Sequence, residues 1–269
     1  MFFRMRPKKR TLLWELIREG GAGASYLFGT MHVQDMRAFA CLEAAQARIL
    51  ECGRLALEFD LSAVPSANIS SELLLPDELT LDQLIPEKAY AKLRAAFLRA
   101  VQLDINAFRH LTPMLASNLI NERLLSKDMP AALDEYLWQF ARRHALPVVG
   151  IETYEEQMDT LRHIPLDYQL QSLLSMGRNL HRQRRQLLGM AAAYERGDIY
   201  QLYQSARRSA SGLRQLLLYR RNRIMAERIG RLVAEQPTFC AIGAGHLAGG
   251  KGVMRLLKQQ GFRLRPVAC

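Results

Sequence analysis

The sequence contains no run of about 20 consecutive apolar residues, which is the length that a membrane-spanning helix needs. It also has no segment rich in proline, glycine or serine that would link two domains, and no low-complexity tract. The basic N-terminus is not followed by a signal-peptide run, because Glu15 interrupts the apolar residues Leu12, Leu13 and Trp14. We therefore expect one domain over residues 1–269 without a transmembrane segment, located in the cytoplasm, or exported if a leader precedes this sequence.

Cysteine is scarce, and the four cysteines are Cys41, Cys52, Cys240 and Cys269. None of them forms a C-x-x-C pair, which argues against a zinc knuckle or a thioredoxin motif. Cys41 and Cys52 flank a predicted helix and would lie roughly 16 Å apart, too far for an unstrained bridge. We therefore expect four free thiols and a reducing compartment.

Acidic residues are fewer than basic ones, which leaves a net charge of +11. A positive balance of this size attracts polyanions such as nucleic acid or anionic lipid. The arginines are not interleaved with aromatic residues, and no nucleic-acid motif accompanies them, so a solvated arginine-rich surface is favoured. We expect a peptide or small-molecule substrate and no nucleic-acid partner, with binding of an anionic partner kept as an alternative.

Short apolar segments bounded by glycine, proline and charged residues predict six strands. They are Thr11–Ile17, Ser25–Phe28, Arg54–Phe59, Leu146–Ile151, Thr238–Ile242 and Arg263–Val267. The glycine-rich turn Gly20–Gly23 predicts a hairpin between the first two strands. The strands lie at both ends of the chain and near Val148, which is typical of an α/β fold with a helical insertion.

Apolar residues at helical spacing predict the helices between these strands. The predicted helices are Arg37–Glu51, Pro86–Val101, Pro113–Leu125, Ala131–Ala145, Asp167–Arg196, Ile199–Ala206, Gly212–Glu235 and Gly249–Gln260. The sequence thus predicts a mainly helical subregion over about residues 86–235 within the single domain.

Two copies of Gly-x-x-His are the most informative pattern in the sequence. They are Gly29-Thr30-Met31-His32 and Gly243-Ala244-Gly245-His246, and each follows a predicted buried strand. Glycine lets the backbone leave the sheet sharply, so each imidazole is expected just past the carboxyl end of a strand. Ligand crevices form there in α/β sheets, and neutral imidazole is a common metal ligand and acid/base group. The alternative is that both histidines only cap turns by hydrogen bonds.

Two glutamates occupy equivalent places, because Glu58 ends one predicted strand and Glu152 follows another. A carboxylate beside buried apolar residues needs a partner, and the candidates are a metal ion, Arg221 or one of the histidines. Arg221 and Asn222 lie on a predicted helix, where they could stabilise an oxyanion. Gln157 could face the same cleft. The alternatives are exposed loop glutamates and an arginine on a solvated helix face.

These residues together resemble the TraB/GumN/Tiki family, which is related to the haem-uptake ChaN proteins and the erythromycin esterases. The resemblance is clearest at the two Gly-x-x-His segments, and it spans nearly the whole chain in the family's order. It also includes Leu13-Trp14-Glu15, Leu57-Glu58, Gly150-Ile151-Glu152-Thr153, Glu156-Gln157, Arg221-Asn222, Gly252 and Gly261.

The resemblance implies an α/β fold of the ChaN/EreA type, with a central mixed β-sheet, a large helical insertion, and two related halves that each supply one Gly-x-x-His. It also implies a metalloprotease-like hydrolase that uses a divalent ion such as manganese, cobalt or zinc. Carried over position by position, the metal-site residues would be His32, His246 and Glu58, and the catalytic pocket would hold Glu58, Glu152, Arg221 and Asn222.

We therefore predict metal-assisted hydrolysis of a peptide or amide bond, with one of Glu58 and Glu152 as metal ligand and the other as general base. Which glutamate takes which role stays open. One alternative is metal-free, esterase-like hydrolysis with a histidine base that the glutamates orient. Another is a non-enzymatic protein that binds haem or a peptide.

Overall fold

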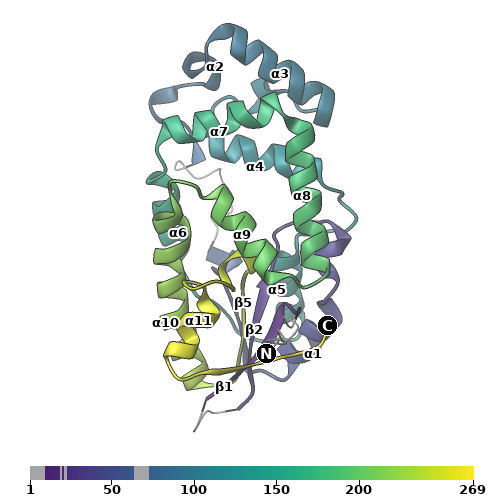
Figure 1. Ribbon diagram of the computed structural model, residues 1–269, viewed down its shortest axis with the longest axis vertical. Coiled ribbons are helices and arrows are strands. Elements are labelled where there is room, and N and C mark those ends of the chain that lie inside the picture. Colours follow the sequence, from purple (N-terminus) through teal and green to yellow (C-terminus); the bar gives the residue numbers. More distant parts are fainter. Residues whose placement is uncertain (1–9, 19, 21–22, 64–72) are drawn as a thin grey trace, which may run out of the picture.

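The computed structural model of the chain in Figure 1 is built around one six-stranded β-sheet with helices on both of its faces. The structure describes all residues except 1–9, 19, 21–22 and 64–72. The strands are β1 (Leu13–Ile17), β2 (Ser25–Thr30), β3 (Arg54–Leu57), β4 (Val148–Gly150), β5 (Thr238–Gly243) and β6 (Arg263–Pro266). All six predicted strands are therefore confirmed, with ends that differ by one or two residues.

The strand order is β4-β3-β5-β2-β1-β6. β4, β3, β5 and β2 run parallel to one another, whereas β1 is antiparallel to both β2 and β6. The predicted mixed sheet and the hairpin between the first two strands are thus confirmed, although Gly21 and Ala22 of its turn lie outside the described residues. The ChaN/EreA-like arrangement and the two related halves stay predictions.

β2 and β5 form the centre of the sheet, and all six residues of β2 are buried. Strands covered on both faces read as continuous apolar runs rather than as an alternation of apolar and polar residues. The runs Tyr26-Leu27-Phe28 and Phe239-Cys240-Ala241-Ile242 have that pattern. The parallel centre of the sheet therefore follows directly from its composition.

The described helices account for most of the remaining chain. They are α1 (Leu42–Leu50), α2 (Leu81–Leu84), α3 (Glu87–Val101), α4 (Pro113–Leu124), α5 (Leu133–Arg143), α6 (Tyr154–Arg162), α7 (Leu166–Arg178), α8 (Leu180–Glu195), α9 (Ile199–Ser209), α10 (Arg221–Glu235) and α11 (Val253–Gln259). Shorter turns are η1 (Met36–Phe39), the π-helical η6 (Gln215–Arg220) and η7 (Ala244–His246). None of the helices in the described part of the chain has the length and apolar composition to cross a membrane.

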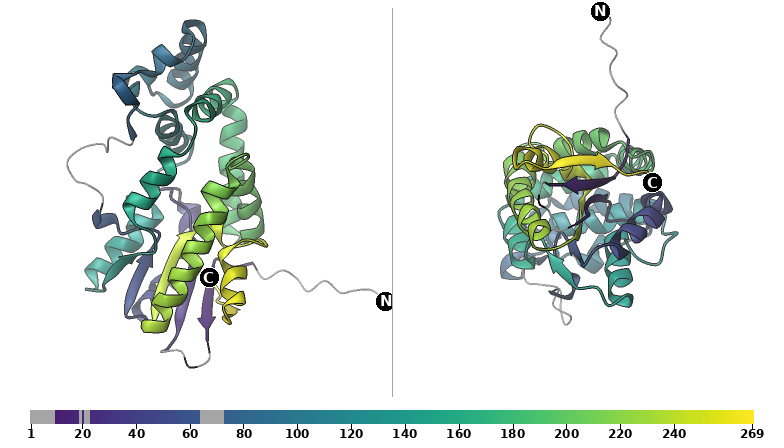
Figure 2. Two further views of the ribbon diagram at one scale, coloured as in Figure 1. Left: turned by 90° about the vertical axis from the view of Figure 1, so that its left-hand side faces the viewer. Right: turned by 90° about the horizontal axis from the view of Figure 1, so that it is seen from below.

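Helices cover the sheet from both sides, as the view from below in Figure 2 shows. α1 and α5 contact each other and pack on one face, and α10 and α11 pack together on the other. The resulting core includes Phe28, Ile49, Leu137, Ile229 and Phe239, each with a relative exposure of 8% or less.

A second apolar cluster holds the helices at the end of the molecule farthest from β1 and β6, at the top of Figure 1. It joins α3, α4 and α7 through buried residues such as Leu93, Phe97, Ile120 and Leu173. This cluster is separate from the core around the sheet, so the helical region has its own apolar packing.

The prediction of one continuous helix over Asp167–Arg196 is wrong. The chain breaks at Asn179, whose backbone φ of −146° is not helical and whose side chain accepts a hydrogen bond from the Arg182 N–H at the start of α8. α7 and α8 therefore run in different directions in Figure 1. Asparagine favours such a cap because its side-chain oxygen satisfies a free backbone N–H.

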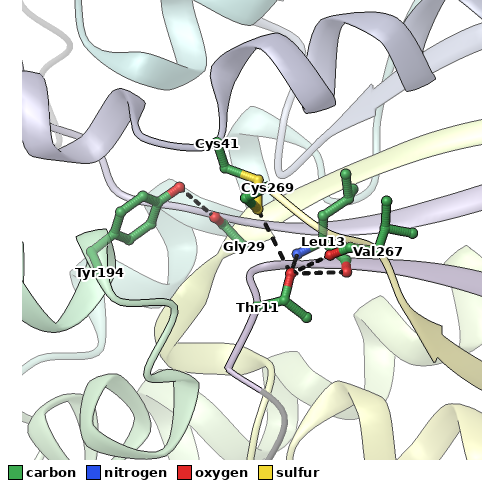
Figure 3. The surroundings of a disulfide bond; sticks show 7 residues. All are labelled: Thr11, Leu13, Gly29, Cys41, Tyr194, Val267 and Cys269. Atoms are coloured by element: carbon green, nitrogen blue, oxygen red, sulfur yellow. Dashed lines mark hydrogen bonds between the residues drawn. A yellow bond between two sulfur atoms is a disulfide. The ribbon is translucent and has the colours of Figure 1, made fainter.

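The expectation of four free thiols is also wrong. Cys41 and Cys269 form a disulfide bond across 228 residues, whereas Cys52 and Cys240 are buried free cysteines. Figure 3 shows the bond beside Thr11, whose hydroxyl donates to a carbonyl oxygen of the segment that follows β6, at 2.7 Å. The disulfide thus ties the residue before α1 to the chain just past the edge strand β6.

Candidate active site

The sheet brings four candidate residues to one edge. Glu152, Glu58, His246 and His32 follow β4, β3, β5 and β2, which are parallel neighbours in that order. Neighbouring strands lie about 4.8 Å apart, so their carboxyl ends present adjacent side chains. The expected convergence at strand ends is thereby confirmed at the level of the backbone.

Arg221 joins the two glutamates from α10. Its Nε donates to both carboxylate oxygens of Glu152, at 3.0 and 3.1 Å, and its Nη2 donates to Glu58 Oε2 at 3.0 Å. The side chains of Arg221, Glu58 and Glu152 are only 17%, 22% and 4% exposed. The interpretations of an exposed loop glutamate and of a solvated arginine are therefore wrong for these three residues.

A π-helical turn, η6, directly precedes Arg221. The structure thus places an irregular turn immediately before the residues that reach into the site, Arg221 and the fully buried Asn222. Such turns are rare and are frequently found at functional sites.

His246 is held by Asn222 in a buried position. Asn222 Nδ2 donates to the carbonyl oxygen of Lys251 at 2.7 Å, and its Oδ1 lies 2.6 Å from His246 Nδ1. Because the carbonyl of Lys251 can only accept, Asn222 Oδ1 faces the ring and Nδ1–H is the donor. The other ring nitrogen, Nε2, is then free of a proton and lies 3.9 Å from Glu58 Oε1.

Burial lowers the pKa of His246 to about 4. The charge of Glu58 acts to raise this pKa, and the charge of Arg221 lowers it further by a smaller amount. Burial alone would raise the pKa of Glu58, but the charges of Arg221 and His246 and the N–H of Gly243 outweigh it, so that pKa lies below its usual value. At neutral pH the site therefore holds a neutral imidazole beside an ionised carboxylate.

The glycines of the two Gly-x-x-His segments have distinct packing roles. A Cβ on Gly29 would lie 2.5 Å from Leu247 Cδ1 and 3.1 Å from Ala244 Cβ, so glycine lets β2 pack against the loop that carries His246. The N–H of Gly243 donates to Glu58 Oε1 at 2.6 Å. The first motif thus supports the loop of the second, and the second motif orients Glu58.

His32 lies at the same edge but contacts different residues. Its side chain is 68% exposed, and Nδ1 lies 3.3 Å from Asp134 Oδ2 in the first turn of α5. The contact with the Asp134 carboxylate raises the pKa of His32, and the charges of Glu122 and Glu135 add to the effect. A cavity of about 220 Å³ opens here, lined by His32, Glu122, Lys127, Glu135 and other residues of the same three segments.

Further polar residues complete the site, and only one of them was expected. Gln157 Nε2 lies 3.5 Å from an oxygen of both Glu58 and Glu152, so the expected residue lies beside the two glutamates. Sequence reasoning missed Lys251 and Asp134, because neither lies in a motif and their roles arise only from packing.

The donor atoms indicate how well these residues suit a divalent metal ion. Imidazole nitrogen and carboxylate oxygen are ligands of manganese, cobalt and zinc. His246 and His32 each have Nδ1 against a side-chain oxygen, which leaves Nε2 available, and Glu58 Oε1 faces His246. The donor chemistry therefore fits, but within the described residues no three His, Cys, Asp or Glu side chains are grouped to hold an ion. His32 would have to approach the other two.

The fold and the site define an α/β protein with a charged, partly buried site at the carboxyl edge of its sheet. The chain belongs to the TraB/PrgY/gumN family, whose model matches residues 12–266. It is 24% identical to Metalloprotease TIKI2 of Danio rerio over 94% of this chain and 60% of that protein. It is 23% identical to Metalloprotease TIKI1 of Homo sapiens over 97% of this chain and 63% of that protein.

The chain thus spans less than two thirds of the length of these relatives. No solved structure matches it. The names of the relatives make hydrolysis the activity to consider at the level of the family, and the details for this chain are proposals.

Proposed function

We propose that this chain is a hydrolase that cleaves a peptide or amide bond with the aid of a divalent metal ion, such as manganese, cobalt or zinc. The observation that carries the proposal is the buried His246, whose Nδ1 is held by Asn222 so that the free Nε2 faces Glu58. The relatives described above are named metalloproteases, which supports the proposal.

His246, Glu58 and His32 are the residues that would hold the ion. A divalent ion bound by such ligands supplies a hydroxide from water near neutral pH and polarises a carbonyl group. Glu58 suits the role of ligand better than Glu152, because Glu152 has both oxygens on Arg221 whereas Glu58 Oε1 faces His246. This choice leaves Glu152 the task of orienting Arg221 rather than the role of general base.

Arg221 is the residue that would stabilise negative charge on the carbonyl oxygen of the substrate. Its hydrogen bonds to Glu58 and Glu152 use Nε and Nη2. In the described part of the chain no group accepts a hydrogen bond from its third nitrogen, Nη1. A guanidinium held rigidly by two carboxylates can thus direct the N–H groups of Nη1 at a developing oxyanion, which is an effective form of electrostatic stabilisation.

The test combines metal analysis with hydrolysis of a peptide library. We expect the protein purified without chelator to contain a divalent ion and to cleave peptides. His246→Ala and His32→Ala should each lose the ion and the cleavage while keeping a cooperative unfolding transition. His163→Ala, which changes an exposed histidine, is the matched control and should retain both. Cleavage by His32→Ala or His246→Ala at the parent rate would contradict the proposal.

A second candidate, metal-free hydrolysis, is favoured by a different observation. Arg221 already provides a fixed positive charge between Glu58 and Glu152, and His246 Nε2 can accept a proton without any ion. Exhaustive chelation separates the two candidates. Peptide or ester hydrolysis that persists in protein shown to contain no metal would favour this candidate over the first. The haem-binding alternative stays a prediction.

We also propose that the chain works in an oxidising compartment rather than in the cytoplasm. The support is the Cys41–Cys269 disulfide, since such bonds persist mainly where thiols are not kept reduced. Trapping free thiols in intact cells tests this proposal. Labelling of both Cys41 and Cys269 there would contradict it.

A further inference from the structure

The imidazole rings of the two Gly-x-x-His segments have the same kind of neighbour at Nδ1. In each, Nδ1 lies against a side-chain oxygen supplied by a helix that packs on the sheet. For His246 the oxygen is Oδ1 of Asn222 on α10, at 2.6 Å. For His32 it is Oδ2 of Asp134 on α5, at 3.3 Å. α10 and α5 cover opposite faces of the sheet (Figure 1), so the two partners approach the same edge from both sides.

Asp134 lies in the first turn of α5, where a negative charge stabilises the helix N-terminus. That effect does not require burial, yet the side chain is only 20% exposed, and within the described residues its Oδ2 makes no hydrogen bond. His32 Nδ1, at 3.3 Å, is the ion-pair partner of this oxygen. A buried carboxylate oxygen without a hydrogen bond costs free energy. The contact with His32 offsets that cost.

The surroundings of Asp134 also connect it to the first motif. Its charge acts on the buried Tyr194, whose hydroxyl donates to the carbonyl oxygen of Gly29 at 2.6 Å. Figure 3 shows this hydrogen bond, which fixes the strand three residues before His32. Asp134 therefore lies near a segment whose backbone is already held in place three residues before His32.

We infer that Asp134 is a positioning residue that holds Nδ1 of His32 and presents Nε2 of His32 to a metal ion, as Asn222 does for His246. The inference rests on the proposed function, because it gives the free Nε2 an ion to bind. A histidine ligand that donates its other N–H to a carboxylate is fixed in tautomer and orientation, and it is more basic toward the metal. Asp134 need not touch substrate or ion to have this effect.

Metal affinity of the metal-free protein tests the inference without reference to turnover. Binding of manganese alone is measured by calorimetry for the parent, for Asp134→Ala and for Glu135→Ala. Glu135 is the next residue and lines the cavity at His32, so its variant removes an equal charge without removing the contact to Nδ1. We expect Asp134→Ala to bind about 10–100-fold more weakly and Glu135→Ala to bind much as the parent does. Equal binding by Asp134→Ala and the parent would overturn the inference while the proposed function stands.

A second readout needs no metal. Nitrogen NMR of His32, recorded well above the ordinary imidazole pKa of about 6.5, reports which ring nitrogen carries the proton. We expect the proton on Nδ1 in the parent and a loss of that preference in Asp134→Ala. A parent protein with the proton on Nε2 overturns the inference. A parent that binds no manganese overturns the metal-dependent function and, with it, the role assigned to Asp134.

Discussion

Asn222 Oδ1 and His246 Nδ1 lie 2.6 Å apart, and this contact decides which ring nitrogen faces Glu58. Asn222 is fully buried, and its amide also donates to the carbonyl oxygen of Lys251. One side chain therefore satisfies the buried ring N–H of His246 and the carbonyl oxygen of Lys251. The same side chain sets the tautomer on which both hydrolytic candidates depend.

Asn222→Ala is expected to lower the free energy of unfolding by about 2–3 kcal/mol, because it leaves the buried N–H of His246 and the carbonyl oxygen of Lys251 without this partner. Urea denaturation of the metal-free protein measures the effect. Asn118→Ala changes an exposed asparagine of α4 and is expected to stay within about 0.5 kcal/mol of the parent. Equal stability of the two variants would mean that Asn222 is not a buried bridge.

Gly29→Ala and Gly189→Ala are expected to act in opposite directions. A methyl group on Gly29 meets Leu247 at 2.5 Å, so we expect a loss of about 1–3 kcal/mol and a displaced His246 loop. A methyl group on Gly189, inside α8, meets nothing within 4 Å, so we expect a gain of about 0.5–1 kcal/mol. Thermal unfolding of both variants measures the difference, and a stable, fully active Gly29→Ala would refute the packing argument.

The sequence was sufficient for the strands and for the residues at their ends. Runs such as Phe239-Cys240-Ala241-Ile242 end at a glycine, and parallel order then places Glu58, Glu152 and His246 together. Local pattern could not show the break at Asn179, because apolar residues continue at helical spacing through α7 and α8.

Two other features depend on tertiary packing alone. The partner of Cys41 lies 228 residues away, so no local spacing could pair it with Cys269. His32 was expected beside His246, and the topology places the two strand ends next to each other, at Thr30 and Gly243. The ring of His32 nevertheless contacts Asp134, which is determined by where α5 packs on the sheet.

Loss of the disulfide should destabilise the chain at the β6 edge of the sheet. Reduction, or Cys269→Ser, is expected to cost about 2–5 kcal/mol, because the bond closes a long loop and holds β6 beside β1. Urea denaturation with and without reductant measures it. Cys52→Ser changes a buried free cysteine and keeps the disulfide, so its stability should still fall when reductant is added. A parent protein with the same stability in both conditions would contradict this role.

Acid stability should depend on Asp35, which lies three residues past His32. Hydrogen bonds from Arg37, with further bonds from Ser126, hold the pKa of Asp35 at about 2, against the effect of burial. A depressed carboxyl pKa stabilises the fold above the unfolded value of 3.8, and this stabilisation is lost as the pH falls toward 2. We expect Asp35→Asn to lack about 2 kcal/mol of that pH dependence. Urea denaturation across this pH range measures the slope of the free energy of unfolding against pH, which should be intermediate in Ser126→Ala. Identical slopes for the parent, Asp35→Asn and Ser126→Ala would refute the assignment.

Arg221→Met should be the most destabilising of these changes. It leaves Glu58 and Glu152 facing each other without the cation that both carboxylates bind. Removal of one partner from a buried ionic group costs about 3–5 kcal/mol, because the remaining charges stay desolvated. Urea denaturation at neutral pH measures the loss. Arg223→Met, at an exposed position of the same helix, is the matched control and should change stability by less than about 0.5 kcal/mol.

The pH dependence of that loss distinguishes repulsion between the carboxylates from a simple loss of packing. Burial raises the pKa of Glu58 and the charge of Arg221 lowers it, so without Arg221 we expect the pKa of Glu58 in the folded variant to rise above its unfolded value. A raised carboxyl pKa gives stability that is present below the unfolded value and lost as the pH rises through the folded value. The deficit of Arg221→Met should therefore be largest near pH 7 and shrink toward pH 4, and Glu152→Gln in the same variant should recover part of it at pH 7. If the loss in free energy of unfolding does not change with pH, the effect comes from the packing of the missing guanidinium and not from its charge.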